Sequence, residues 1–402
     1  MMRKPRISRL APALLCLLLL LPLAGCWSRH ELNDISIVVG MGIDKKNGRY
    51  QVSAQIVNPG QVTQKKNGGG SFSPVVTYQA SGLTIPDALA RMTVKAARDL
   101  YLSHLRILIL GEEIARGGIS KPLDFISRNR ELRTDFFLIV AKNASASEIL
   151  DMYSPIDPIP SNSLFTKLET SDNTWSATGK VTLDRLIQDL SKEGKGPALT
   201  TIELIGKPQA GEKISSAQNI NPAVVLKYDG MAAFKYDRMA GWMDENDARV
   251  LNFIQNSTYM TTLTAPCPGS KGLVSYQVLR SKAKIRSLAP DEFEVVLHTQ
   301  QDIADIGCRL DITDPSTLSA LTKAADEKLE AMMNKTIRKL QKQLKVDVFG
   351  FGDALHRQNP KEWHKIKDWN REFETAKVKV KSVSTIRRIG TTIKSMEDEI
   401  KK

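Results

Sequence analysis

The amino-acid sequence predicts an α+β protein with several domains, in which mixed sheets are covered by helices and the C-terminal domain contains one long amphipathic helix. Its 402 residues are more than a single hydrophobic core usually holds. Short apolar runs alternate with helical patterns across residues 35–152, which is typical of a sheet with covering helices. Apolar residues also recur at three- and four-residue steps across residues 315–344, which indicates a helix with one buried stripe.

The first 25 residues have the order of a secretory signal, with a basic start, an apolar run over residues 10–23 and two small residues. That run is short for a permanent span, which needs roughly 20 apolar residues. Leu23-Ala24-Gly25-Cys26 resembles a bacterial lipobox, in which the cysteine thiol takes a diacylglycerol and the chain is cut before it. The alternative is an ordinary signal peptide with Cys26 as a structural thiol. The small pair directly before the cysteine favours a lipoprotein that begins at Cys26, outside the cytoplasm.

The segment after Cys26 predicts a first domain over residues 26–215. Asn47-Gly48 has the chemistry of a tight turn and joins two strands into a hairpin. Residues 64–74 are Gly-rich and predict a loop. The strands are predicted at residues 35–40, 50–57, 75–80, 105–110 and 136–141, and the helices at residues 86–101, 112–128 and 147–152.

Residues 157–216 are rich in Ser, Thr, Asn, Gly and Pro. They predict a loosely packed segment with one helix at residues 183–190 and a strand at residues 201–205. This composition places the end of the first domain near residues 211–221.

A second domain is predicted over residues 216–390, followed by a charged tail at residues 391–402. Asp229-Gly230 indicates the turn of an opening hairpin. Asp314 and Pro315 supply the N-cap and first-turn proline of the long helix. The other helices are predicted at residues 245–255 and 361–373, and the strands at residues 273–279, 283–287, 293–299 and 377–386.

The net charge of +13 is unevenly distributed, because residues 323–402 alone carry a net +8. This basic C-terminal fifth predicts contact with anionic lipid headgroups or with an acidic partner. A solvated helix face with lysines for solubility is an equal alternative. Nucleic acid is disfavoured as a partner because the protein is predicted to be exported.

The sequence has four cysteines, of which Cys16 leaves with the signal and Cys26 is the lipidation site. Cys267 and Cys308 remain, in a compartment where disulfides persist. A bond between them would stabilise the fold by roughly 3–4 kcal/mol on the entropic model. Two buried free thiols are the alternative.

Sequence patterns of catalytic sites are absent: there is no P-loop, no Gly-x-Ser-x-Gly elbow and no His-Glu-x-x-His. His356 and His364 are separated by eight residues across a proline, which is no metal-ligand spacing. The sequence therefore predicts a protein that is not an enzyme and holds no cofactor or metal, and it leaves binding and assembly as the function.

Several stretches resemble the Ger(x)C lipoproteins, the C subunits of bacterial spore germinant receptors. The start of the mature chain does so through Cys26-Trp27, Glu31-Leu32-Asn33 and residues 37–44, and the middle does so through residues 105–112 and 115–119. Arg29-His30 departs from the acidic residue that many members have. The most specific part is the C-terminal signature, in family order: Val348-Phe349-Gly350-Phe351-Gly352, His356-Arg357, Asn359-Pro360, Trp363 and Ile386-Arg387-Arg388-Ile389-Gly390.

The resemblance implies a protein lipid-anchored through Cys26 on the outer face of the spore inner membrane. There it would work with two integral-membrane subunits, A-type and B-type, in a receptor that senses small nutrients and triggers germination. It identifies no residue that binds a nutrient. The alternative function is an extracytoplasmic solute-binding lipoprotein of a transporter, which predicts two similarly sized α/β lobes with a cleft between them.

Overall fold

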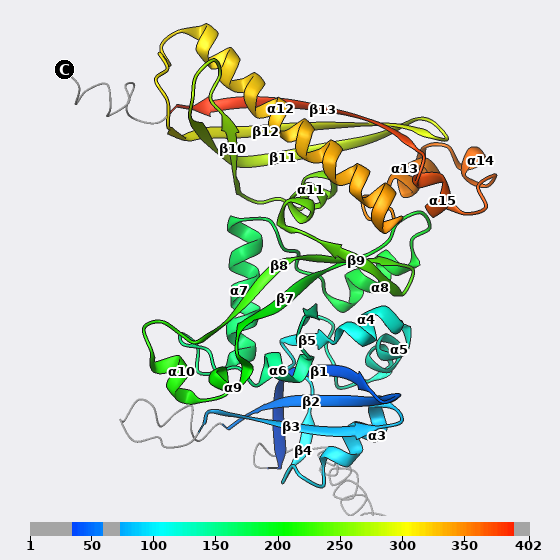
Figure 1. The fold of residues 1–402 in the computed structure, drawn as a ribbon. Helices are drawn as coiled ribbons and strands as arrows, with labels where there is room; N and C mark the ends of the chain where they lie inside the picture. The colour runs from blue at the N-terminus through cyan, green and yellow to red at the C-terminus, as the bar shows by residue number, and fades with distance from the viewer. Residues whose placement is uncertain (1–33, 59–72, 390–402) are drawn as a thin grey trace, which may run out of the picture.

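The computed structural model describes residues 34–58 and 73–389, which form two sheets stacked along the length of the molecule (Figure 1). The larger sheet contains nine strands of the described chain, in the order β3-β2-β1-β5-β6-β7-β8-β9, with β4 paired to β1. Its strands are β1 (Ile35–Lys46), β2 (Arg49–Val57), β3 (Val75–Gly82), β4 (Asp99–Tyr101), β5 (Ile107–Leu110), β6 (Phe137–Lys142), β7 (Ala198–Gly206), β8 (Val224–Lys235) and β9 (Arg238–Met243).

The middle of the larger sheet is parallel, because β1, β5, β6 and β7 run in the same direction. Parallel strands are normally buried on both faces, and here helices cover both. One face packs against α3 (Ile85–Met92), α4 (Glu112–Gly117), α5 (Ser120–Arg128) and α8 (Leu183–Ser191), and the other against α6 (Ala146–Leu150) and α7 (Pro160–Thr174). Two short helices, α9 (Pro208–Gly211) and α10 (Ile214–Gln218), connect β7 to β8.

The smaller sheet has the order β10-β11-β12-β13 and is covered by helices on one face. Its strands are β10 (Thr261–Pro266), β11 (Leu273–Ala289), β12 (Glu292–Ile306) and β13 (Lys377–Arg388). The long helix α12 (Pro315–Lys339) buries Leu321, Leu329 and Met333 against this face and continues as a π-helical turn, Leu340–Leu344. On β11 and β12, buried and exposed residues alternate, as expected for a sheet with one face in water.

Four further helices pack into the core under the smaller sheet. Helix α11 (Glu245–Gln255) lies between the two sheets and contacts both β8 and β11 (Figure 1). After the π-helical turn come α13 (Phe351–Gln358), α14 (Pro360–Trp363) and α15 (Trp369–Phe373), and the chain then enters β13 at the edge of the smaller sheet.

The α+β class with mixed sheets, covering helices and a long C-terminal helix is confirmed, but several predicted elements were wrong. The helix predicted over residues 86–101 ends at Met92, because residues 99–101 pair with β1 as strand β4. The helix predicted over residues 112–128 is broken at Gly118, whose φ of 123° a helix cannot accommodate. Strands predicted at residues 273–279 and 283–287 form the single bulged strand β11.

The segment over residues 157–216 is not loosely packed, contrary to prediction. It contains the 15-residue helix α7, which buries Leu164 and Leu168 in a polar sequence, and strand β7 inside the larger sheet. The helix predicted over residues 361–373 is two helices, α14 and α15. The hairpin predicted over residues 223–235, with its turn at Asp229-Gly230, is wrong, because residues 224–235 form the single strand β8. β8 pairs with β7 and β9 and extends the larger sheet, while the division at residue 215 stays a prediction.

Candidate functional site at the junction between the two sheets

The site residues predicted from sequence lie apart from one another. Cys26 falls outside the described residues. Cys267 and Cys308 are joined by a disulfide with Cα atoms 6.5 Å apart, which connects the turn after β10 to the segment after β12. Within residues 34–58 and 73–389, no group of three or more His, Cys, Asp or Glu residues could hold a metal ion. His356 stacks on Trp363, with ring centroids 5.3 Å apart.

The C-terminal signature folds around one buried carboxylate, Asp347, which is 1% exposed. Its Oδ1 accepts hydrogen bonds from the backbone N–H groups of Phe349 and Gly350, both at 2.9 Å. Its Oδ2 accepts from the Gly352 N–H and from Trp369 Nε1, both at 3.0 Å. One side chain therefore fixes both the loop after α12 and helix α15.

Burial raises the pKa of Asp347 to about 6, although the four hydrogen bonds to its oxygens act in the opposite direction. At neutral pH the group is a buried carboxylate that depends on those four donors. Sequence analysis did not single it out. The available signal was an Asp directly before the signature with glycines three and five positions later, since Asp side chains commonly accept from nearby backbone amides in turns.

The signature glycines are needed because two chain segments approach each other closely. A Cβ atom on Gly352 would lie 2.6 Å from Trp369 Nε1 and 2.7 Å from the Cα of Gly194, which precedes β7. Gly350 has a φ of 93° and Gly194 a φ of 76°, both in the region that favours glycine. The signature is therefore packed directly against the N-terminal half of the chain.

The loop between α8 and β7 is the partner of the signature. The Gly196 N–H donates to the backbone oxygen of Asp347 at 2.7 Å, and Trp363 Nε1 donates to a Glu193 carboxylate oxygen at 2.9 Å. Lys195, buried in the same loop, lies 3.1 Å from Asp189. Burial lowers the pKa of Lys195, and the nearby Asp189 carboxylate acts in the opposite direction. The attraction between the two charges therefore offsets part of the cost of removing them from water.

Helix α11 makes the second connection between the sheets. Asn252 Nδ2 donates to the backbone oxygens of Ser176 at 2.8 Å and Thr178 at 2.7 Å. Gln255 Nε2 donates to the backbone oxygen of Val348 at 2.7 Å. The Arg249 guanidinium lies 4.5 Å from the Trp175 ring centroid, and its burial lowers the pKa of Arg249 to about 10.

Two open cavities flank this junction. One of about 450 Å³ is lined by Asp172, Lys180, Asn252 and Tyr259, among others. The other, of about 430 Å³, is lined by the 190–197 loop and by Trp363 and Trp369, among others. Several charged side chains here form ion pairs, including Lys180–Asp172 at 3.2 Å and Lys195–Asp189 at 3.1 Å. The junction is therefore suited to joining the two sheets.

Comparisons with known proteins cover nearly the whole chain. The family described as "Spore germination protein N-terminal domain" matches residues 28–204, and "Spore germination B3/ GerAC like, C-terminal" matches residues 229–390. Spore germination protein KC of Bacillus subtilis (strain 168) is 30% identical over 389 residues, which cover 94% of this chain and 95% of that protein. Spore germination protein B3 of the same organism is 23% identical, with 93% and 96% covered.

One solved structure has a similar fold. The crystal structure of the GerBC protein matches with a TM-score of 0.52 at 18% identity, covering 86% of this chain and 96% of that one. None of the helices in the described parts of the chain is long and apolar enough to cross a membrane.

Proposed function

Since this chain belongs to the Ger(x)C family of spore germination proteins, we propose that it is a lipid-anchored, non-catalytic subunit of a nutrient germinant receptor. In this proposal Cys26 carries the lipid and holds the protein on the outer face of the spore inner membrane. Diacylation with a further N-acyl group would give stable anchoring, whereas a single chain binds only marginally.

The observation that carries this proposal is that residues of the C-terminal signature make structural contacts between the two sheets. Its glycines, together with Trp363 and the preceding Asp347, join the two sheets through hydrogen bonds and close backbone packing. Residues that make buried structural contacts are suited to assembly, and this supports a role in building and coupling a receptor. The proposed partners are the two integral-membrane subunits, A-type and B-type.

The proposed organisation keeps the predicted divisions. The signal at residues 1–25 is removed, residues 26–215 and 216–390 form two germination-protein domains, and residues 391–402 form a charged tail. A solute-binding lipoprotein of a transporter is the alternative function. It is less favoured, because two similarly sized lobes with an open cleft differ from sheets of nine and four strands that are joined by buried hydrogen bonds.

The test is affinity purification of a tagged full-length protein from solubilised spore inner membranes, with identification of the co-purifying proteins by mass spectrometry. We expect both integral-membrane receptor subunits, and we expect Cys26→Ala to remove the protein from the membrane fraction. Recovery of a nucleotide-driven permease in place of the receptor subunits would contradict the proposal and favour the solute-binding alternative. Full membrane retention of Cys26→Ala would contradict the anchor.

A further inference from the structure

The face of the smaller sheet that α12 leaves uncovered is exposed and rich in basic side chains. We call it the basic face. β11 and β13 flank residues 292–300 of β12. Their outward basic residues along this stretch are Arg280, Lys282, Lys284 and Arg286 on β11, and Lys377, Lys379 and Lys381 on β13. The outward residues of β12 between them are Glu292, Glu294, Val296, His298 and Gln300.

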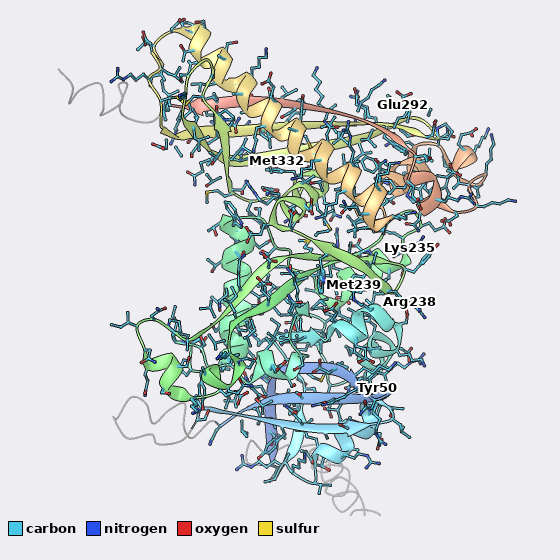
Figure 2. All side chains as sticks on the ribbon, in the orientation of Figure 1. Tyr50, Lys235, Arg238, Met239, Glu292 and Met332 are labelled. Carbon is cyan, nitrogen blue, oxygen red and sulfur yellow. A yellow bond between two sulfur atoms is a disulfide. The ribbon has the colours of Figure 1, made fainter. Side chains whose placement is uncertain are left out.

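Over residues 292–300 of β12, the negative charge on this face is confined to the Glu292 end, and the next outward carboxylate is Asp302, beyond Gln300. Glu294 pairs with Arg286 at 3.4 Å, and Glu292 pairs with Lys379 at 2.6 Å. Figure 2 labels Glu292 at this end of the sheet. Further along, no described carboxylate lies within 4.0 Å of Lys282, Lys284 or Lys381. The acids therefore neutralise the Glu292 end of the face and leave its middle, around Lys282, Lys284 and Lys381, positive.

The remaining bases lie on both sides of the neutral outward residues of β12: Arg280, Lys282 and Lys284 on β11, and Lys381 on β13. Lys284, Val296 and Lys381 are neighbours across the three strands. Lys282, His298 and Val383 are the next set of neighbours across them. β11 and β13 are two strand spacings apart, about 10 Å. A hollow of about 690 Å³ lies here, lined by basic, polar and aromatic side chains including Arg280, Lys282, His298, Gln300 and Tyr259.

From this geometry we propose that the basic face binds an acidic segment of a partner protein. The segment lies over β12, and its carboxylates reach the bases on both flanking strands. A helix with its side chains is about 10–12 Å wide and matches the separation of β11 and β13. The proposal deepens the proposed receptor role and rests on it for the presence of partner proteins.

Lipid headgroups fit this face less well, for a geometric reason. β1 begins at the end of the molecule opposite the smaller sheet (Figure 1). The eight residues from Cys26 to Asp34 span at most about 28 Å. The strand spacings from β1 to β9 amount to about 24 Å, and α11 adds a layer of about 10 Å before the smaller sheet begins. A chain anchored at Cys26 and standing upright on its membrane would therefore hold the basic face away from that membrane.

The test is photo-cross-linking in the full-length, membrane-anchored protein, with a benzophenone amino acid placed at position 298 on β12, between the bases of β11 and β13. The charge-reversal variant is Lys282→Glu, Lys284→Glu and Lys381→Glu combined. Its matched control reverses three exposed bases that lie outside the smaller sheet: Lys121→Glu on α5, Arg130→Glu after α5 and Lys207→Glu after β7. Thermal unfolding checks that both triple variants fold.

We expect one protein adduct whose cross-linked peptide is acidic, reduced about tenfold or more by the charge reversal, since 1.4 kcal/mol of lost binding corresponds to tenfold. The control should keep the adduct, and Asp/Glu→Lys changes in the cross-linked segment should restore it to the reversed variant. Adducts formed mainly with phosphatidylglycerol, or an adduct unaffected by the reversal, would overturn the proposal.

Failure of this proposal and failure of the proposed function give different results. If the receptor subunits still co-purify but no acidic protein cross-links to position 298, the basic-face proposal alone is wrong. If an acidic protein that is no receptor subunit cross-links there, the basic-face proposal stands and the receptor assignment is wrong.

Discussion

Replacing Asp347 with Asn tests how the junction is held together. The amide keeps one oxygen for two of the four donors and puts an NH₂ group against the other two, the Gly352 N–H and Trp369 Nε1. Leaving a buried donor without an acceptor costs about 1–3 kcal/mol each. Removing the buried charge offsets part of that loss, because the shift of the pKa from 3.8 to about 6 corresponds to about 3 kcal/mol.

The sign of the pH dependence follows from the raised pKa. Between the unfolded and folded pKa values, the native state holds the proton and the unfolded state has released it, so the stability from this group falls as pH rises through that window. Asn does not titrate. We therefore expect the destabilisation by Asp347→Asn to be about 2 kcal/mol larger near pH 4.5 than near pH 7.5.

The assay is urea unfolding of the purified mature protein at both pH values, followed by tryptophan fluorescence. Asp353→Asn is the matched control, since its side chain is 27% exposed and forms a surface ion pair with Arg357. That change should alter the free energy of unfolding by less than about 1 kcal/mol. A destabilisation by Asp347→Asn that is equal at the two pH values would refute the reasoning.

Three further predictions concern the disulfide, a glycine and the signature. Cys267→Ser with Cys308→Ser should lower the free energy of unfolding by about 3–4 kcal/mol, and reducing the wild type should give the same loss in a melting experiment; an unchanged melting temperature would contradict this. Gly352→Ala should destabilise by several kcal/mol because its Cβ meets backbone, whereas the control Gly117→Ala, with open space around it, should be neutral or stabilising by about 0.5–1 kcal/mol. Deleting residues 346–390 should abolish the germinant response of spores, and a normal response would show that this region is dispensable.

The fold class was predictable because hydrophobic periodicity survives wherever helices and strands are amphipathic or fully apolar. Helix α7 was missed because Leu164 and Leu168 are nearly its only apolar buried residues, and its neighbours are Ser, Thr and Asn. Strand β4 was missed because three residues beside β1 carry no periodic signal of their own. In both cases tertiary packing overrides local propensity.

The candidate site was harder to predict than the fold. Asp347 gains its importance from Trp369, 22 residues away, and from backbone amides that converge on it only in the folded chain. Counting charges located a basic excess in residues 323–402, yet four of the seven bases of the basic face come from β11, in residues 280–286. Composition cannot reveal which distant strands share a face, because that depends on register.

The position of β13 has a consequence for how the protein reaches its native state. This strand completes the smaller sheet by pairing in parallel with β12, although about 70 residues separate the two in the chain. Non-local parallel pairing is slow because the intervening loop must close first. During export the C-terminal residues emerge last, so β12 waits with an unpaired edge until they arrive. Chaperone demand and proteolytic vulnerability should therefore be concentrated in that interval, and a chain that ends early would keep the edge exposed.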